Sequence, residues 1–353
     1  MKITRIKIQQ ITLKLKVPYT IAYETYDTVT NVFVRVETDR GIVGFGCAAP
    51  DEHVTGETPE LIVKDFQTII SPIVINADPL RYSLILDKVN KTISNHPGTI
   101  AALDMALFDI LGKVSGLPLW KLLGGFRDKI ITSVTIGILS EDETIRQAKE
   151  FVKQGFKAIK LKGGLDVESD IIRIIKIREA IGKNIKLRFD ANQGYSVAQA
   201  LQFIEHVKKA NIEFIEQPTK KEKPELSGKV KINSTIPIMA DESLITTKDA
   251  LNLIANNLVD LFNIKLMKVG GMQKALQINA IAQAAGLDVM TGCMDESALA
   301  IAAGLHFTLA NPNIKYADLD GHFDLIGDPA EGSVVLHDGY LHPTDKPGLG
   351  INL

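Results

Sequence analysis

Five charged residues recur along the chain at intervals that suit a single catalytic site. Lys162, Asp190, Glu216, Asp241 and Lys265 follow one another at intervals of 28, 26, 25 and 24 residues. A strand, a helix and two short connections need about this length. We therefore expect these residues at the same position of successive strand–helix units, where the carboxyl ends of the strands of a barrel converge. Three carboxylates gathered there would bind a hard divalent cation, Mg²⁺, through oxygen.

A further lysine lies two residues before the first of these. Ile159 and Leu161 alternate with Lys160 and Lys162, and this period of two predicts a strand with both lysines on one face. Adjacent ammonium groups repel each other, so they make sense where carboxylates lie opposite. A Lys-x-Lys pair alone is more often a solvated strand edge, and each carboxylate alone could be a helix cap or a strand terminus. The joint spacing of all five residues favours a site.

At two points neighbouring residues compete for one role. Strand alternation favours Asp241 over Glu242 as the metal ligand, and Lys265 over Lys268 as the lysine that faces the site. Glu242 and Lys268 are then expected to support the site from behind, together with Asn192.

Strand and helix patterns alternate from about residue 131 onward. The strand candidates are 131–136, 157–162, 185–190, 212–216, 236–240, 260–265, 287–290 and 315–319, with amphipathic helices such as 166–181, 196–210 and 271–285 between them. The first third differs, because strands there form a hairpin and a helical region, 59–113, follows. We expect residues 16–28 to form a loop rich in Tyr and Thr. The pattern predicts an α/β barrel preceded by an α+β domain.

These patterns divide the chain into three segments. We expect an α+β capping domain over 1–125, a catalytic barrel over 126–320, and a tail over 321–353 that returns to the capping domain. The tail begins with a cluster of Gly, Pro and Asp residues and contains two short strand candidates.

The composition excludes several classes of protein. The 353 residues are 45% hydrophobic and carry a net charge of −2, which argues against a nucleic-acid-binding surface. Cys47 and Cys293 stand in no metal or redox spacing, as expected of a reduced, cytoplasmic setting. The first residues resemble a strand and not a signal peptide, and no apolar run is long enough to span a membrane. We expect neither nucleic acid nor membrane as a partner, and a homo-oligomer.

Several motifs in the chain occur together in one superfamily. They are the helix Ala101–Lys113, Leu122-Leu123-Gly124-Gly125, the Lys-x-Lys pair, the Asp/Glu/Asp series, Asn263–Gly271, Met294-Asp295-Glu296 and Asp318-Leu319-Asp320. This set resembles the enolase superfamily, in its muconate-lactonizing subgroup, and is most similar to the dipeptide epimerases. The resemblance implies a (β/α)7β modified TIM barrel, capped by a domain built from both chain ends, and one Mg²⁺ per subunit.

The resemblance also implies the chemistry. Dipeptide epimerases invert the α-carbon of the C-terminal residue of an L,L-dipeptide by a 1,1-proton transfer through an enediolate. Lys162 and Lys265 would then be the acid/base groups on opposite faces of that carbon, and Lys160 would neutralise the substrate carboxylate. An enediolate needs concentrated positive charge, which Mg²⁺ and a nearby lysine can supply.

Substrate contacts are expected from the ends of other strands. Asp318 and Asp320 resemble the clamp with which dipeptide epimerases hold the substrate's α-ammonium group, although a turn before Gly321 could also explain them. Thr135 could donate to the substrate carboxylate, and Glu296 is expected as polar support at the substrate.

The Tyr/Thr segment would cover the barrel mouth and meet the substrate side chains. Epimerases that act on Ala-Glu have an arginine near its end, where this chain has Glu24 next to Tyr23. We therefore expect apolar, aromatic or basic side chains in place of glutamate. The alternatives are o-succinylbenzoate synthase or N-acylamino-acid racemase, whose substrates lack a free α-ammonium group, and a non-catalytic binding protein on the same barrel.

Overall fold

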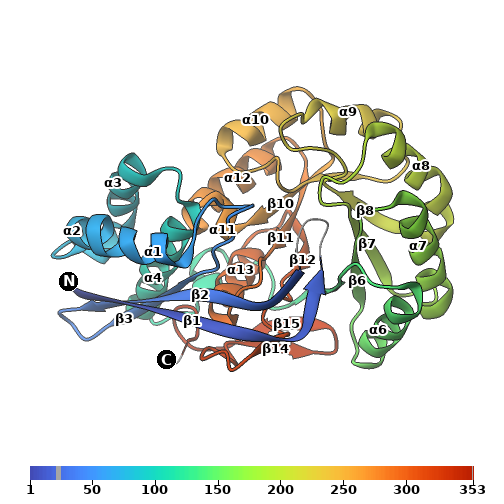
Figure 1. Ribbon diagram of the computed structural model, residues 1–353. Helices are drawn as coiled ribbons and strands as arrows, with labels where there is room; N and C mark the ends of the chain where they lie inside the picture. Colours follow the sequence, from blue (N-terminus) through green and yellow to red (C-terminus); the bar gives the residue numbers. More distant parts are fainter. Residues whose placement is uncertain (21–24, 352) are drawn as a thin grey trace.

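The structure is a computed structural model that describes residues 1–20, 25–351 and 353. Figure 1 shows an antiparallel sheet with a group of helices beside a ring of parallel strands that is surrounded by further helices. The first part is the cap and the second is the barrel.

The barrel is a parallel sheet whose neighbours follow the order of the chain from β5 to β12. Its strands are β5 (Ser133–Ile136), β6 (Ala158–Lys162), β7 (Lys186–Asp190), β8 (Ile212–Glu216), β9 (Ile238–Ala240), β10 (Leu261–Lys265), β11 (Asp288–Gly292) and β12 (Ile314–Asp318). A parallel bridge between Thr132 and Ala317 joins the two edges of the sheet, so the strands close into a ring. The predicted (β/α)7β barrel is confirmed, and every predicted strand overlaps an observed one.

Helices connect these strands and pack outside the ring. They are α6 (Glu141–Lys153), α7 (Val167–Ile181), α8 (Val197–Val207) with the short η3 (Lys208–Ala210), α9 (Glu225–Ile232), α10 (Thr247–Ala255), α11 (Leu266–Val269), α12 (Met272–Ala284) and α13 (Ala298–Ala310). Several begin at a capping side chain, because Ser140, Asp166, Ser196 and Thr246 each accept a hydrogen bond from an amide of the first turn.

The cap combines a hairpin-rich sheet with helices. Its elements are β1 (Ile3–Thr20), β2 (Thr25–Thr38), β3 (Val43–Ala48), α1 (Pro59–Asp65), η1 (Phe66–Ile70), α2 (Ser71–Val74), η2 (Pro79–Arg81), α3 (Tyr82–Ile93), α4 (Pro97–Ser115) and α5 (Leu119–Leu122). The short β4 (Ile130–Ile131) then leads into the barrel.

The prediction of a loop over residues 16–28 was wrong for the described residues. β1 continues to Thr20 and β2 begins at Thr25, and these two residues pair with each other. The register is irregular between Lys14 and Tyr19, a stretch that contains Pro18, and proline within a sheet is typical of such bulges. The β-branched and aromatic residues of the segment favour the extended backbone once an antiparallel partner is present.

Helix α4 joins the cap to the barrel. It is apolar on nearly all sides and almost wholly buried, as expected of a helix that packs against both parts. Its two aspartates bind backbone amides of other elements. Asp104 accepts hydrogen bonds from Met272 N and Gln273 N at the start of α12, at 2.6 and 3.1 Å, and Asp109 accepts one from Phe45 N in β3 at 2.9 Å. The Asp104 contacts fix the cap to the barrel, while the Asp109 contact holds α4 against the sheet of the cap.

The tail contacts both parts through short strands. These are β13 (Leu325–Ile326), β14 (Val334–His337) and β15 (Tyr340–Pro343). β13 pairs with β1 of the cap, whereas β15 pairs with β4 at the entry to the barrel.

Within the described residues, no single helix is both long and apolar enough to cross a membrane, and one bent helix pair, Pro59–Val74 with Pro79–Ile93, meets the criteria of length and composition only when taken together.

Candidate active site

Three carboxylates meet at the carboxyl ends of neighbouring barrel strands. Asp190 ends β7, Glu216 ends β8 and Asp241 directly follows β9. One oxygen from each lies within 4.8 Å of the others, and all three residues are buried. Burial, followed by the charge of Asp190, raises the pKa of Glu216 to about 8. Gathering three carboxylates at a buried position thus makes the charged form of Glu216 unfavourable.

A lysine flanks this triad on each side. Lys162 Nζ lies 2.7 Å from Asp190 Oδ2, and Lys265 Nζ lies 2.9 Å from Asp241 Oδ2. Their strands, β6 and β10, are four apart in the sheet order, so the two ammonium groups approach the triad from opposite walls of the barrel. Burial alone would lower the pKa of Lys265, but Asp241 and Glu216 outweigh it and raise that pKa above its usual value.

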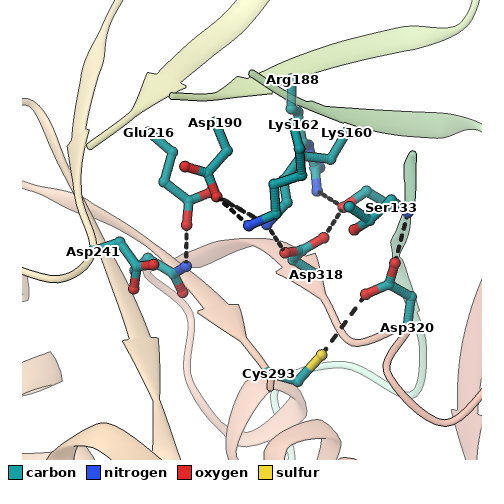
Figure 2. A network of polar contacts seen from close by, with 12 residues as sticks. Ser133, Lys160, Lys162, Arg188, Asp190, Glu216, Asp241, Cys293, Asp318 and Asp320 are labelled. Atoms are coloured by element: carbon teal, nitrogen blue, oxygen red, sulfur yellow. Dashed lines mark hydrogen bonds and ion pairs between the residues drawn. The ribbon is translucent and has the colours of Figure 1, made fainter. Parts of the chain in front are cut away.

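Lys160 lies below Lys162 on the same face of β6 and bridges two groups of carboxylates (Figure 2). Its nearest partner is Asp318 Oδ2, while Glu216 Oε2 and Asp190 Oδ2 are 3.5 and 3.6 Å away. Its side chain is almost fully buried. The Lys-x-Lys pair therefore faces the carboxylates, as predicted, and does not form a solvated edge.

The two aspartates at the eighth strand have different surroundings. Asp318 has both oxygens engaged, since Oδ1 accepts from Ser133 Oγ at 2.5 Å and Oδ2 binds Lys160. Asp320 Oδ2 accepts from Thr135 N at 2.6 Å, whereas Oδ1 accepts a long hydrogen bond from the Cys293 thiol at 3.7 Å. Burial, followed by the charge of Asp318, raises the pKa of Asp320 to about 7. Only Asp320 thus presents a weakly engaged oxygen.

A cavity of about 460 Å³ lies above these groups, between the cap and the barrel. Lys160, Lys162 and Lys265 line its floor, together with the pair from the eighth strand. Further carboxylates line it, and some of them come from the loop after β3, the loop after β11 and the tail, such as Asp51, Asp295 and Asp324. Burial raises the pKa of Asp295 to about 6, and its acidic neighbours add to the rise. The cavity is therefore anionic apart from the three lysines.

The residues expected to support the site from behind lie in two places, since Lys268 lies behind Asp241 whereas Asn192 and Glu242 line the cavity. Asn192 Nδ2 donates to Glu242 Oε1 at 3.2 Å, and both residues line the cavity beside the triad. Lys268 donates to the side chain of Asp241 from behind, and it is absent from the cavity lining, whereas Lys265 is present.

One expected substrate contact is different in the structure. Glu296 is buried, but it does not line the cavity, because its Oε1 accepts from the Met294 amide at 2.9 Å within its own turn. Thr135 lines the cavity, and its backbone amide donates a hydrogen bond to Asp320. Tyr23 and Glu24 lie outside the described residues.

Four polar residues that hold the site together were not predicted. Asn263 Nδ2 donates to Glu216 Oε1 at 2.8 Å, and Gln217 Oε1 accepts from the amide of Asp241 at 2.9 Å. Ser133 and Arg188 lie beneath Asp318. A sequence signal existed for Asn263 and Arg188, because each is a polar residue at an inward-facing position of a barrel strand.

Two family models together match nearly the whole chain. The model described as "Mandelate racemase / muconate lactonizing enzyme, N-terminal domain" matches residues 3–124, and the model described as "Enolase C-terminal domain-like" matches residues 143–353. The chain belongs to the mandelate racemase/muconate lactonizing enzyme family. This confirms the predicted membership of the enolase superfamily.

Relatives of this chain within the mandelate racemase/muconate lactonizing enzyme family carry the names of epimerases. A protein of Desulforapulum autotrophicum named L-Lys-D/L-Arg epimerase is 42% identical, with 99% of each chain covered. A dipeptide epimerase from Enterococcus faecalis, solved with Mg and the dipeptide L-Leu-L-Tyr, is 38% identical with a TM-score of 0.97 over 100% of both chains. The L-Ala-D/L-Glu epimerase of Bacillus subtilis, solved in a substrate-liganded complex, is 36% identical with a TM-score of 0.97 over 99% of both. The prediction of an isomerase is confirmed at this level.

The carboxylate triad fits the Mg²⁺ site expected of this family. It offers only oxygen ligands, which is the donor set that Mg²⁺ prefers. The raised pKa of Glu216 has a physical cause that a cation would remove, namely buried negative charge. Beside the triad, Glu242 Oε2 is buried without a hydrogen-bond partner among the described residues. Asp190, Glu216 and Asp241 would hold the ion.

Proposed function

We propose that this protein is a Mg²⁺-dependent dipeptide epimerase that inverts the α-carbon of the C-terminal residue by a 1,1-proton transfer. The supporting observation is the placement of Lys162 and Lys265 on opposite walls of one cavity, each within 3 Å of a carboxylate of the same triad. Inversion requires one group to remove the α-proton and another to deliver a proton from the opposite side.

The lysines divide the work by position. Lys162 exchanges the proton on one face of the α-carbon and Lys265 exchanges it on the other. Lys160, which lies deeper in the barrel, places its charge beside the substrate carboxylate and so stabilises the enediolate. When bound, Mg²⁺ supplies further positive charge at that carboxylate and lowers the pKa of the neighbouring lysines, so that one of them can act as a base.

A free α-ammonium group on the substrate would bind at the eighth strand. Asp320 Oδ1 faces the cavity with only a weak thiol contact nearby among the described residues, and the adjacent Asp318 adds negative charge. A substrate acylated at nitrogen offers no cation and would leave this carboxylate desolvated and unpaired. This favours a dipeptide over the N-acylated substrates of the alternative racemase and synthase.

The cavity favours basic or apolar side chains over glutamate. Asp51, Asp295 and Asp324 line it, and we place the substrate side chains beside them. A glutamate side chain there would meet like charge, whereas a lysine or arginine side chain would find counterions. The name of the Desulforapulum relative, L-Lys-D/L-Arg epimerase, agrees with this preference. The expected contribution of Glu24 lies outside the described residues.

A dipeptide library in deuterated water tests this function. Epimerisation through two lysines incorporates solvent deuterium at the α-carbon, which mass spectrometry detects for each member of the library. We expect Ala-Lys, Lys-Arg and Ala-Leu to exchange faster than Ala-Glu, and N-acetyl dipeptides to exchange far more slowly. Absence of exchange with every free dipeptide would contradict the proposal, and fastest exchange with Ala-Glu would contradict the side-chain preference.

A further inference from the structure

A chain of buried hydrogen bonds leads from the interior of the barrel to Lys160 (Figure 2). Arg188 Nη1 donates to Ser133 Oγ at 3.1 Å, Ser133 Oγ donates to Asp318 Oδ1 at 2.5 Å, and Asp318 Oδ2 binds the Lys160 ammonium group. All four residues are at most 2% exposed. These residues come from β7, β5, β12 and β6, so the chain of bonds crosses the line where the barrel closes.

Arg188 is held rigidly at the base of this chain. Its guanidinium carbon lies over the rings of Phe214 and Tyr316, 5.5 and 5.3 Å from their centroids, and the two rings meet edge to face. Nη1 also donates to Ala317 O at 2.7 Å, and Nε donates to Glu213 Oε2 at 3.0 Å. Contact with aromatic rings together with a fork of donors fixes an arginine in a way that a lysine cannot reproduce. The position of Arg188 is therefore set by contacts that do not involve the triad.

The Lys160 ammonium group lies within ion-pairing distance of three carboxylates. Asp318 is nearest, but Glu216 and Asp190 lie only 3.5 and 3.6 Å away. Lys160 thus already makes long contacts with the two carboxylates that we assign to Mg²⁺, and a small shift away from Asp318 would shorten them. An ammonium group on those oxygens would compete with the metal ion for them.

We propose that Ser133 and Arg188 are positioning residues that act through Asp318 to limit how closely the Lys160 ammonium group approaches the Mg²⁺ ligands. Ser133 satisfies one oxygen of Asp318 and orients the other toward Lys160, while Arg188 holds the Ser133 hydroxyl. The purpose of this role rests on the proposed function, because the role leaves Lys160 facing the substrate carboxylate. The effect of the two residues on Mg²⁺ binding, in contrast, does not depend on any substrate.

Calorimetric titration of Mg²⁺ into the metal-stripped protein tests the proposal without any substrate. Ser133→Ala removes one hydrogen bond to a charged group and changes no charge, so we expect the Mg²⁺ dissociation constant to rise about three- to tenfold. Ser227→Ala is the matched control, since Ser227 is also buried and its hydroxyl forms a hydrogen bond with the Thr219 hydroxyl at 2.9 Å. The control should bind Mg²⁺ like the parent protein.

Arg188→Met distinguishes positioning from simple electrostatics, because the two explanations predict opposite changes in Mg²⁺ affinity. Removing a positive charge near the triad would tighten Mg²⁺ binding by Coulomb's law alone, whereas loss of positioning weakens it. We expect weaker binding, by about tenfold or less. An unchanged constant in Ser133→Ala, or tighter binding in a folded Arg188→Met protein, would overturn the proposal. If Arg188→Met does not fold, Ser133→Ala decides alone.

The two proposals can fail separately. Weakened Mg²⁺ binding in Ser133→Ala, together with no deuterium exchange in any dipeptide by the parent protein, would support the positioning role and contradict the epimerase. Deuterium exchange by the parent protein, together with unchanged Mg²⁺ binding in Ser133→Ala, would support the epimerase and contradict the positioning role.

Discussion

Replacement of Asp320 by asparagine should separate recognition of the substrate's ammonium group from the proton transfer itself. Asparagine keeps an oxygen that can accept the hydrogen bond from Thr135 N, now at 2.6 Å, so the loop after β12 should keep its conformation. It loses the negative charge at the oxygen that lies near the Cys293 thiol, which is where we place the α-ammonium group.

The magnitude follows from the kind of bond that is lost. A hydrogen bond to a charged group contributes about 1.5–3 kcal/mol, which corresponds to a factor of about 10–150 in an equilibrium constant. We therefore expect kcat/KM for a free dipeptide such as Ala-Lys to fall by about 10- to 150-fold in Asp320→Asn, mainly through KM. The N-acetylated dipeptide has no cation to lose, so its slow rate should stay within about threefold of the parent value.

The assay is α-deuterium incorporation followed by NMR for both substrates and both enzymes, at saturating Mg²⁺. The ratio of the two effects is the informative quantity, since a general loss of folding or metal would lower both rates equally. Equal losses for the free and the acetylated dipeptide would refute the assignment of Asp320 to the ammonium group.

Three further predictions concern the metal, the bases and stability. Removal of one ligand oxygen should weaken Mg²⁺ binding and activity by orders of magnitude, and full activity after chelator treatment would contradict this; the variants are Asp190→Asn, Glu216→Gln and Asp241→Asn. Lys162→Ala and Lys265→Ala should each abolish epimerisation yet still exchange the α-proton of opposite stereoisomers, as NMR of the separate L,L and L,D dipeptides would show. Burial lowers the pKa of His306 to about 3, below its value in the unfolded chain, so the stability it contributes is present above about pH 6.5 and is lost as the pH falls toward 3. Asparagine at this position can still accept the hydrogen bond from Trp120 N but cannot titrate. When the pH is lowered from 7 to 5, the free energy of unfolding should therefore decrease by about 2 kcal/mol less in His306→Asn than in the parent protein. Urea denaturation at the two pH values measures this, and equal decreases would contradict the prediction.

The barrel and the core of its site could be predicted because both depend on local patterns. Lys162, Asp190 and Glu216 were located by the length of one strand–helix unit, and a strand of period two sends alternate residues inward whatever its neighbours are. The same alternation selected Asp241 over Glu242, in agreement with the cluster in the structure. The strand structure of the described residues 16–20 and 25–28, where we expected a loop, was missed because the extended backbone there depends on pairing between β1 and β2.

The network beneath the site depends on closure of the barrel, which no local pattern describes. Arg188 and Ala317 are 129 residues apart, yet they share a hydrogen bond because β7 and β12 face each other across the ring. The different roles of Asp318 and Asp320 likewise follow from their partners on β5 and β6, although in the sequence the two aspartates look equivalent.

The sequence by itself therefore determined which strand ends carry the carboxylates and lysines, since the repeat of the strand–helix unit is encoded in chain length and apolar spacing. Only the tertiary structure decided which oxygen each ammonium group pairs with, and which carboxylates of the cap and tail line the cavity. The physical reason is that those pairings are made between segments far apart in the chain, and buried charges take the partner that the closed fold brings within hydrogen-bonding distance.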